Sequence, residues 1–390
     1  MKAGTNRLRI VLGSEMLASY PQGGGTGMGF LQYLFGLADM GHDVFWLELL
    51  HSSGDASKDR RLIATYFRRL RHYGFGARCA LLLFDVDDES GSLESAQPYG
   101  MSTLRVRELL TSADLLWSFA GAVPLPLLSL CKRPVFVDGD PGHLQVAALE
   151  WDMGLHNYSV RLSVGSKLND PDCEVPRLGL LWHTFMPYVF LPLWTVRPDP
   201  GAQAPFSSVT HWEHGEIRLG DRALSISKRD AYLRYLDLPE RAARPFMLSA
   251  NIHPDDDSGD RERLQAHGWT IAHPYAVAAT PASYRRFIRS SRAEIACVKP
   301  VYRELKTGWF SERSACYLAS GRPVLAEATG FSAHLPTGQG MLEFQDMDSA
   351  LAGVAEIDAH YARHARASRE LAVEYLGSPR CLEAMLSACG

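Results

Sequence analysis

The sequence lacks any segment that would carry the chain into or across a membrane. No apolar run reaches the about 18 residues that a transmembrane helix needs. Residues 1–9 are polar and lead directly into "LRIVLG", without the charged and apolar regions of a signal peptide. We therefore expect a cytoplasmic protein with no membrane partner.

Paired cysteines and runs of basic residues are also missing. The seven cysteines are scattered, and none shows the CxxC spacing of a zinc or redox motif. The formal net charge is −4, and no long Lys/Arg run occurs, which disfavours nucleic acid as a partner. The sequence therefore predicts neither a disulfide framework nor a structural zinc site.

What is present is an ordinary globular composition in a chain too long for one core. With 390 residues, 46% of residues apolar and 22% charged, two domains are the expectation. The first half alternates strand and helix patterns, starting with a strand at 8–13, a helix at 27–41 and a strand at 42–49. Such alternation predicts an α/β fold with a parallel sheet covered on both faces.

The alternation is interrupted in the middle of the chain and then resumes. The region 171–205 is rich in proline and aromatic residues, and strands and helices return from 244 onward. We expect an N-terminal domain over 1–205, a linker over 206–243 and a C-terminal domain over 244–390. The last helix is expected to be able to cross back to the first domain.

Two widely separated segments carry a family resemblance. In the C-terminal half, "EIACVKP", "SERSACYLAS", "GRPVLAEATG" and "GMLEF" follow one another, and the N-terminal half has "GGGTGMGFLQYLFGLADMGHDVFWLE". Together these segments resemble GT-B glycosyltransferases, over about half of the chain and in the same order. The resemblance implies two Rossmann-like domains with parallel sheets facing across a cleft, and metal-independent sugar transfer from a nucleotide-diphosphate sugar.

The resemblance leaves the stereochemistry open. Retaining members usually carry two Glu residues where this chain has Gly308 and Cys316. The "HCGWNS" signature of plant-type inverting members is only partly matched by "KTGWFS" at 306–311. The chain therefore resembles a divergent branch of the fold.

The junction at 306–324 is the predicted donor site. A helix starting near Ser311 would offer free amides and a positive dipole end to a diphosphate, with Lys306 and Arg313 adding charge. Glu312 is expected to accept hydrogen bonds from ribose hydroxyls. Lys299, at the end of a strand, is a second phosphate candidate. The alternative is that Ser311 only caps its helix and that its neighbours are solvated.

A run of glycines is predicted to face the donor from the other side of the cleft. Gly24, Gly25 and Thr26 belong to "GGGTG" at 23–27, between the first strand and the first helix. Without Cβ atoms, such a loop lets a ligand approach the backbone amides closely. A plain tight turn is the alternative.

Candidate catalytic residues follow two N-terminal strands. "VDGDPGHLQ" places Asp140 and His143 after a strand, and Glu15 follows the first strand. Direct displacement by a hydroxyl needs a base, and each of the three is a candidate. The alternative is that Asp140 caps the following helix and His143 lies at the rim.

Other polar and aromatic clusters have simpler interpretations. "HWEH" at 211–214 lacks a convincing third metal ligand, so no metal site is predicted. Residues Asp255, Asp256 and Asp257 are expected to form a solvated turn. The aromatic residues of 182–194 are expected to pack in the core, with an apolar acceptor pocket as the alternative: Trp182, Phe185, Tyr188 and Trp194.

The expected function is glycosyl transfer from a nucleotide-diphosphate sugar to a small or medium-sized acceptor, in specialised metabolism and without a further cofactor. A nucleotide-sugar epimerase, a non-catalytic nucleotide-sugar-binding subunit and a DNA-modifying glycosyltransferase remain alternatives. Incubation of the donor alone would separate an epimerase from a transferase. Donor, acceptor and oligomeric state stay open.

Overall fold

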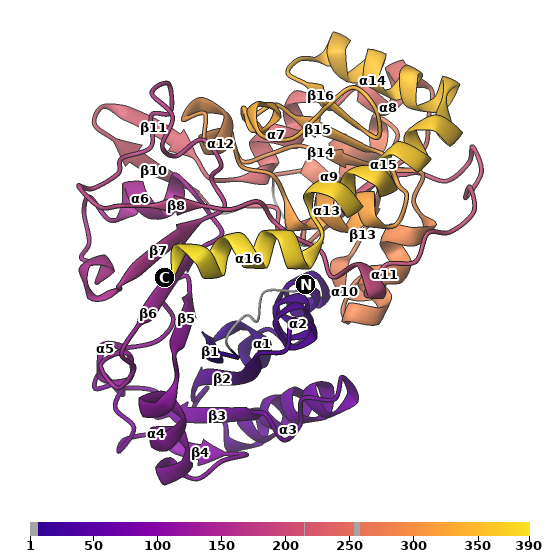
Figure 1. Cartoon of the computed structure of the whole chain (residues 1–390). Helices are drawn as coiled ribbons and strands as arrows, with labels where there is room; N and C mark the ends of the chain where they lie inside the picture. Colours follow the sequence, from indigo (N-terminus) through magenta and orange to yellow (C-terminus); the bar gives the residue numbers. More distant parts are fainter. Residues whose placement is uncertain (1–6, 214, 253–257) are drawn as a thin grey trace, which may run out of the picture.

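The computed structural model describes residues 7–213, 215–252 and 258–390 and has two lobes, each built on its own sheet (Figure 1). We call the lobe with the eight-stranded sheet the N-lobe and the lobe with the six-stranded sheet the C-lobe. The α/β architecture with two facing parallel sheets, expected from the sequence, is confirmed.

The N-lobe sheet is parallel except at one edge. Its strands are β1 (Arg9–Ser14), β2 (Asp43–His51), β3 (Cys79–Phe84), β4 (Gln97–Tyr99), β5 (Leu115–Phe119), β6 (Pro134–Asp138), β7 (Val160–Ser163) and β8 (His183–Thr184). Their order is β4-β3-β2-β1-β5-β6-β7-β8, and β4 alone runs antiparallel to its neighbour. The short β4, β7 and β8 were not predicted from the sequence.

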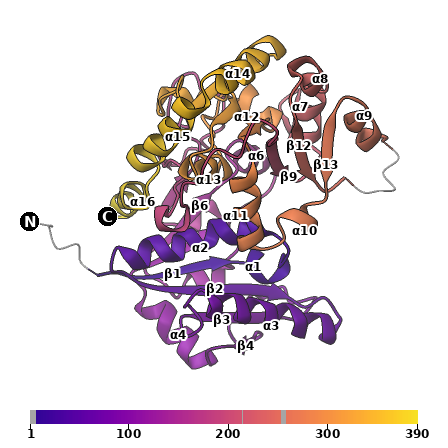
Figure 2. The same ribbon diagram turned by 90° about the vertical axis from the view of Figure 1, so that its right-hand side faces the viewer.

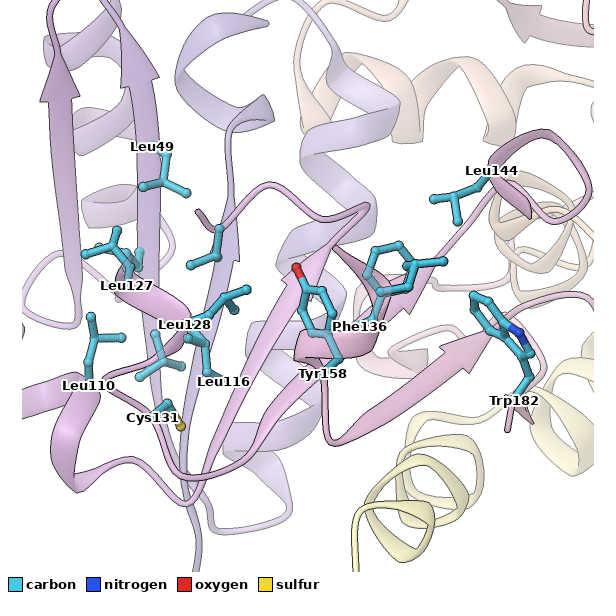
Figure 3. Packing of buried hydrophobic residues seen from close by; sticks show 14 of the residues in the cluster. Leu49, Leu110, Leu116, Leu127, Leu128, Cys131, Phe136, Leu144, Tyr158 and Trp182 are labelled. Carbon is cyan, nitrogen blue, oxygen red and sulfur yellow. The ribbon is translucent and has the colours of Figure 1, made fainter. Parts of the chain in front are cut away.

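Helices cover both faces of this sheet. They are α1 (Met16–Ser19), α2 (Gly24–Asp39), α3 (Ala56–His72), α4 (Thr103–Ser112), α5 (Leu125–Leu128) and α6 (His143–Ala147). Along β1, Val11 packs into one apolar cluster and Ile10 and Leu12 into another, all with 0% exposure. Figure 3 shows the first cluster, where Leu127 and Leu128 of α5 lie near Leu116. Burial on both faces explains the continuous apolar runs of these strands.

The C-lobe sheet is parallel throughout. Its strands are β9 (Phe206–Thr210), β12 (Phe246–Ala250), β13 (Trp269–Ala272), β14 (Ala293–Ala296), β15 (Val324–Glu327) and β16 (Met341–Phe344). The order β13-β12-β9-β14-β15-β16 puts the first strand in the centre, with later strands on both sides, as in Rossmann folds. Its helices are α7 (Lys228–Arg234), α8 (Leu238–Ala242), α9 (Asp260–Ala266), α10 (Pro274–Val277), α11 (Pro281–Ser290), α12 (Pro300–Glu304), α13 (Glu312–Ala319), α14 (Met347–Ala359) and α15 (Tyr361–Tyr375).

Most of the segment 206–243, expected to link the domains, is part of the C-lobe, because it supplies the central strand β9 and the helices α7 and α8. The hairpin of β10 (Glu216–Leu219) and β11 (Arg222–Ser225) lies against α6 of the N-lobe and α12 of the C-lobe, and its Leu224 belongs to an apolar cluster of the N-lobe. The expectation failed because β9, "FSSVT", is short and half polar, and its serines Ser207 and Ser208 carry no apolar signal although they are fully buried.

The last helix returns to the N-lobe. α16 (Ser378–Ala388) lies beside α2 (Figure 1), and Cys381, Leu382 and Met385 belong to an apolar cluster of the N-lobe. The Arg133 guanidinium donates hydrogen bonds to the carbonyl oxygens of Cys389 (2.7 Å) and Gly390 (2.6 Å). The C-terminal helix therefore ties the two lobes together.

Within the described ranges, no helix combines the length and the apolar character that crossing a bilayer requires. All seven cysteines lie in these ranges and are free thiols, six of them buried.

Candidate functional site

A cavity of about 530 Å³ lies between the lobes. Phe119 and Val137 reach it from the ends of β5 and β6, Thr210 from the end of β9, and Ser311 from the start of α13. Ligands of doubly wound sheets bind outside the carboxyl ends of the strands, and the volume lies within the about 300–1,000 Å³ typical of ligand pockets. This cavity is the candidate functional site.

Six apolar or aromatic side chains of the N-lobe form one surface of the cavity. We call this surface the N-lobe wall, which consists of Phe30, Tyr33, Phe119, Val137, Val164 and Phe185. The Phe119 ring centre lies 5.0 Å from that of Phe30 and 4.9 Å from that of Tyr33, with both ring pairs edge to face. Phe30 is partly exposed, whereas the other five side chains are at most 8% exposed.

The C-lobe side is polar and is centred on the first turn of α13. Ser311, Glu312 and Arg313 all line the cavity, and the Ser311 hydroxyl accepts a hydrogen bond from the Arg313 amide (3.1 Å). The first-turn amides of a helix have no acceptor within the helix and lie at the positive end of its dipole. The predicted junction therefore lies at the cavity and can hold an anion.

Glu312 is a carboxylate without a protein partner. It forms no hydrogen bond or ion pair with any residue in the described ranges, and burial raises its pKa to about 7. Its Oε2 approaches α2 so closely that a Cβ on Gly29 would lie 2.6 Å from it. A hydroxyl of a bound ligand would satisfy this carboxylate.

Arg313 serves the fold as well as the cavity. Its guanidinium donates to the fully buried carboxylate of Glu294 and, through Nη1, to the Val209 carbonyl oxygen (2.9 Å). Burial opposes the charge, but Glu294 raises the pKa of Arg313 above its ordinary value. Its Nη2 is buried without an acceptor in the described part of the chain. Removing this charge would leave Glu294 buried and unpaired.

A buried cation that was not predicted from the sequence lies next to this turn. Lys228, 6% exposed, donates to the Cys297 carbonyl oxygen (3.0 Å), and its Nζ lies 5.0 Å from the ring centre of Trp309, which lines the cavity. Burial, reinforced by the charges of Arg313 and Lys299, lowers the pKa of Lys228 to about 7. The sequence feature that could have indicated this lysine is "SISK" at 225–228, where an N-cap serine precedes a lysine at the start of α7, the first helix after β9.

Asp140 lines the cavity but is already paired. Its carboxylate accepts hydrogen bonds from Lys299 and Tyr302 of the C-lobe, and the His143 Nδ1 lies 3.3 Å away. Burial opposes ionisation, but the His143 hydrogen bond and the Lys299 charge hold the pKa of Asp140 below its usual range. An ion-paired carboxylate with a low pKa is a weak base. Asp140 therefore joins the lobes.

The remaining predicted polar residues lie outside the cavity lining. His143 is the first residue of α6 and contacts Asp140, and the exposed Glu15 precedes α1. The exposed Lys306 has a φ of 51°, and the backbone at Thr307 next to it accepts a hydrogen bond from the Lys167 amide of the N-lobe (3.2 Å). The structure therefore places Glu15, His143 and Lys306 outside the cavity lining, and Lys299 lies outside it too, where it pairs with Asp140.

The glycines expected in a loop are helical. α2 begins at Gly24, so Gly24, Gly25 and Thr26 form its first turn, although all three do line the cavity. A Cβ on Gly24 would lie 2.1 Å from the Ala278 carbonyl oxygen. Figure 2 shows α2 beside α11. The missing Cβ of Gly24 thus lets α2 touch the C-lobe backbone, and donor binding by Gly24, Gly25 and Thr26 stays a prediction.

The other clusters separate into core and cavity. Trp182, Tyr188 and Trp194 are at most 1% exposed and pack in the core, whereas Phe185 reaches the cavity. His211 lines the cavity, but His214 of the same "HWEH" segment lies outside the described residues, as do Asp255, Asp256 and Asp257.

Comparisons with known proteins identify the fold. The sequence matches no protein-family model, and no curated protein of similar sequence was found. Among solved structures, an alpha-glucosyltransferase in complex with UDP-glucose and DNA containing an abasic site is 14% identical, with a TM-score of 0.58 over 98% of this chain and 100% of that chain.

Two further solved structures are similar in fold over nearly the whole length of this chain. The HepE protein of Anabaena in complex with UDP and glucose is 10% identical, with a TM-score of 0.57 over 98% of this chain and 99% of that chain. The sucrose-phosphate synthase of Thermosynechococcus elongatus is 12% identical, with a TM-score of 0.52 over 98% of both chains. The chain therefore has the GT-B fold, as the sequence resemblance implied.

Proposed function

We propose that the chain is a glycosyltransferase that binds a nucleotide-diphosphate sugar in the cavity and transfers the sugar to a hydroxyl group of a small or medium-sized acceptor. The structures of similar fold include complexes with UDP-glucose and with UDP and glucose, which supports a nucleotide-sugar donor. The donor carries the activated bond itself, so the proposal needs no cofactor.

The observation that carries the proposal is the buried positive charge beside α13. Arg313 pairs with Glu294 and Lys299 with Asp140, whereas Lys228 has a carbonyl acceptor but no carboxylate partner among the described residues. Burial, and then the charges of Arg313 and Lys299, lower the pKa of Lys228 to about 7, because burying a cation without an anion to offset it is unfavourable. A diphosphate at the first turn of α13 would supply that anion.

In the proposed complex, the leaving group is held by the C-lobe side of the cavity around the first turn of α13, which we call the C-lobe wall. The α13 amides, the Ser311 hydroxyl and the Arg313 Nη2 donate to the diphosphate, while Lys228 and Lys299 add positive potential. These groups are fixed before the reaction, and such preorganised charge stabilises the negative charge that develops on the diphosphate.

Glu312 is proposed to take the acceptor proton. The acceptor oxygen bonds to the anomeric carbon, and the bond from that carbon to the diphosphate breaks, with its electron pair leaving on the diphosphate. The hydroxyl proton passes to Glu312, whose pKa of about 7 suits a base at neutral pH. Asp140, one of the three base candidates from the sequence, is paired with Lys299.

The test is a calorimetric titration of the Lys228→Met variant with UDP and with UMP. We expect about 10- to 100-fold weaker UDP binding, because the positive potential of Lys228 behind the cavity lining is lost, and a smaller change for UMP. The melting temperature should not fall, because an apolar side chain suits this buried position. Lys306→Met, an exposed lysine outside the cavity lining, is the matched control. Unchanged UDP affinity in Lys228→Met would contradict the proposal.

Transfer to nucleic acid is a second candidate, favoured by one surface feature. α3 and α11, one from each lobe, lie on the face shown in Figure 2. Their exposed arginines form no ion pair with a carboxylate of the described residues: Arg60, Arg61, Arg68, Arg71 and Arg286. One protein of similar fold was solved with DNA. Salt-dependent DNA binding that is lost in Arg68→Gln/Arg286→Gln, but not in Arg105→Gln on α4, would support this candidate.

A further inference from the structure

We infer that the acceptor is an aromatic or similarly apolar compound with a hydroxyl group, held against the N-lobe wall. The inference rests on the proposed function, because it assigns the cavity space that the nucleotide does not occupy. It concerns the chemical class of the acceptor.

The shape and the apolar chemistry of the N-lobe wall suit an apolar ligand. Its side chains come from five separate parts of the lobe: α2, the ends of β5 and β6, and the segments after β7 and β8. Phe30 and Tyr33 meet Phe119 edge to face, and the partly exposed Phe30 offers a ring to a further aromatic partner. Convergence of apolar side chains at strand ends, where ligands bind in this fold, points to an apolar ligand.

The N-lobe lines the cavity with polar side chains at or before the start of α2, at Tyr20, Gln22 and Thr26, but the two polar side chains beside the N-lobe wall, Gln32 and Asp140, already have partners. The Gln32 Oε1 accepts hydrogen bonds from the Phe190 amide (3.1 Å) and the Trp194 indole (2.8 Å). Asp140 is bound by Lys299 and Tyr302. A sugar acceptor would lose its hydrogen bonds to water here and find few replacements, whereas an aromatic ring loses none.

A further argument is the position of Glu312 relative to the wall. Its carboxylate contacts α2 at Gly29, next to Phe30 and one turn before Tyr33. An acceptor lying on these two rings therefore has its polar end near an unpartnered carboxylate. An apolar body with one hydroxyl fits this surface, and a molecule with many hydroxyls does not.

The experiment compares three acceptors with UDP-glucose as donor: 2-naphthol, D-glucose and a short DNA duplex. We expect glucosylation of 2-naphthol at a kcat/KM at least about 10-fold above that for D-glucose, because a hydrophobic pocket discriminates by fit and burial. UDP binding, measured by calorimetry on the same preparation, tests nucleotide binding separately from acceptor preference.

Two variants locate the acceptor. Phe30→Ser should raise the KM for 2-naphthol about 10-fold or more and leave the UDP affinity unchanged. Val137→Thr, which keeps the volume of the side chain, should act in the same direction if Phe30→Ser does not fold.

The outcomes are distinguishable. UDP binding together with transfer to D-glucose or DNA in preference to 2-naphthol, or with no transfer to any of the three, would overturn the acceptor inference and leave nucleotide binding standing. Absence of UDP binding would overturn the proposed function and this inference with it.

Discussion

The two walls of the cavity stand at the carboxyl ends of parallel strands, yet their chemistry is opposite. The N-lobe wall consists of aromatic and aliphatic side chains, and the nearby carboxylate of Asp140 is paired with Lys299. The C-lobe wall presents a helix N-terminus, an unpartnered carboxylate on Glu312 and a buried cation on Lys228 behind it. One topology thus provides two different surfaces.

The difference follows from what each wall would have to stabilise. A diphosphate needs donors and positive charge that are fixed before it binds, and burial makes such charges effective. An acceptor body needs only removal of apolar surface from water. Because the two demands are met on different lobes, changes on one wall should affect one substrate and leave the other unaffected.

The largest expected effect is on the rate of transfer in Glu312→Gln. We expect the rate to fall about 10²-fold or more, since a general base contributes about 10²–10⁴-fold. UDP affinity should stay within about 3-fold of wild type, a change under 1.4 kcal/mol. Single-turnover rates and calorimetry measure the two quantities. A variant that loses UDP binding but keeps its rate at saturation would assign Glu312 to the donor instead.

The next largest effect is expected on the free energy of unfolding when Arg313 is replaced. Arg313→Met should lower the free energy of unfolding by about 3–5 kcal/mol, because Glu294 is left buried without its partner. Adding Glu294→Gln should recover most of that loss in urea denaturation, while UDP binding stays weak in both variants. If the single variant is fully stable, the ion pair is not structural.

The contact between the two lobes is tested at Gly24. An alanine there would place Cβ 2.1 Å from the Ala278 carbonyl oxygen, so we expect a loss of about 1–3 kcal/mol in the free energy of unfolding. Alanine favours helices over glycine, so any net loss must come from this contact. Gly139→Ala, which has open space around it, is the control. Equal stability of both variants would show that the lobes separate without cost.

The smallest effect is the pH dependence of UDP binding. Lys228 is charged below its pKa of about 7, and UDP binding favours the charged form. The affinity should therefore decrease as the pH rises through about 7, and Lys228→Met should flatten this dependence. Calorimetry between about pH 6 and 8 checks the sign, and a rising affinity in this range would rule out a phosphate-binding role for Lys228.

Much of the fold could be predicted from the sequence, because the long elements carry their own periodicity. The strand–helix–strand start of the N-lobe, expected over 8–13, 27–41 and 42–49, appears as β1, α2 and β2. β9 could not be predicted, because its buried serines look like a loop until the neighbouring strands are in place.

The candidate site was predictable where it depends on local structure. Ser311, Glu312 and Arg313 lie at the cavity because a helix start is a local feature. The partners of Asp140 and the burial of Lys228 depend on contacts between distant segments, which spacing does not encode. The glycine run was interpreted as a ligand loop, although the close contact is made by the other lobe.

The most direct test of the central claim is a crystal structure of the chain with UDP. The account predicts the diphosphate at the first turn of α13, within hydrogen-bond distance of its amides and of the Arg313 Nη2, with the N-lobe wall left free. A nucleotide bound against Phe30 and Phe119, or outside the cavity between the lobes, would contradict it.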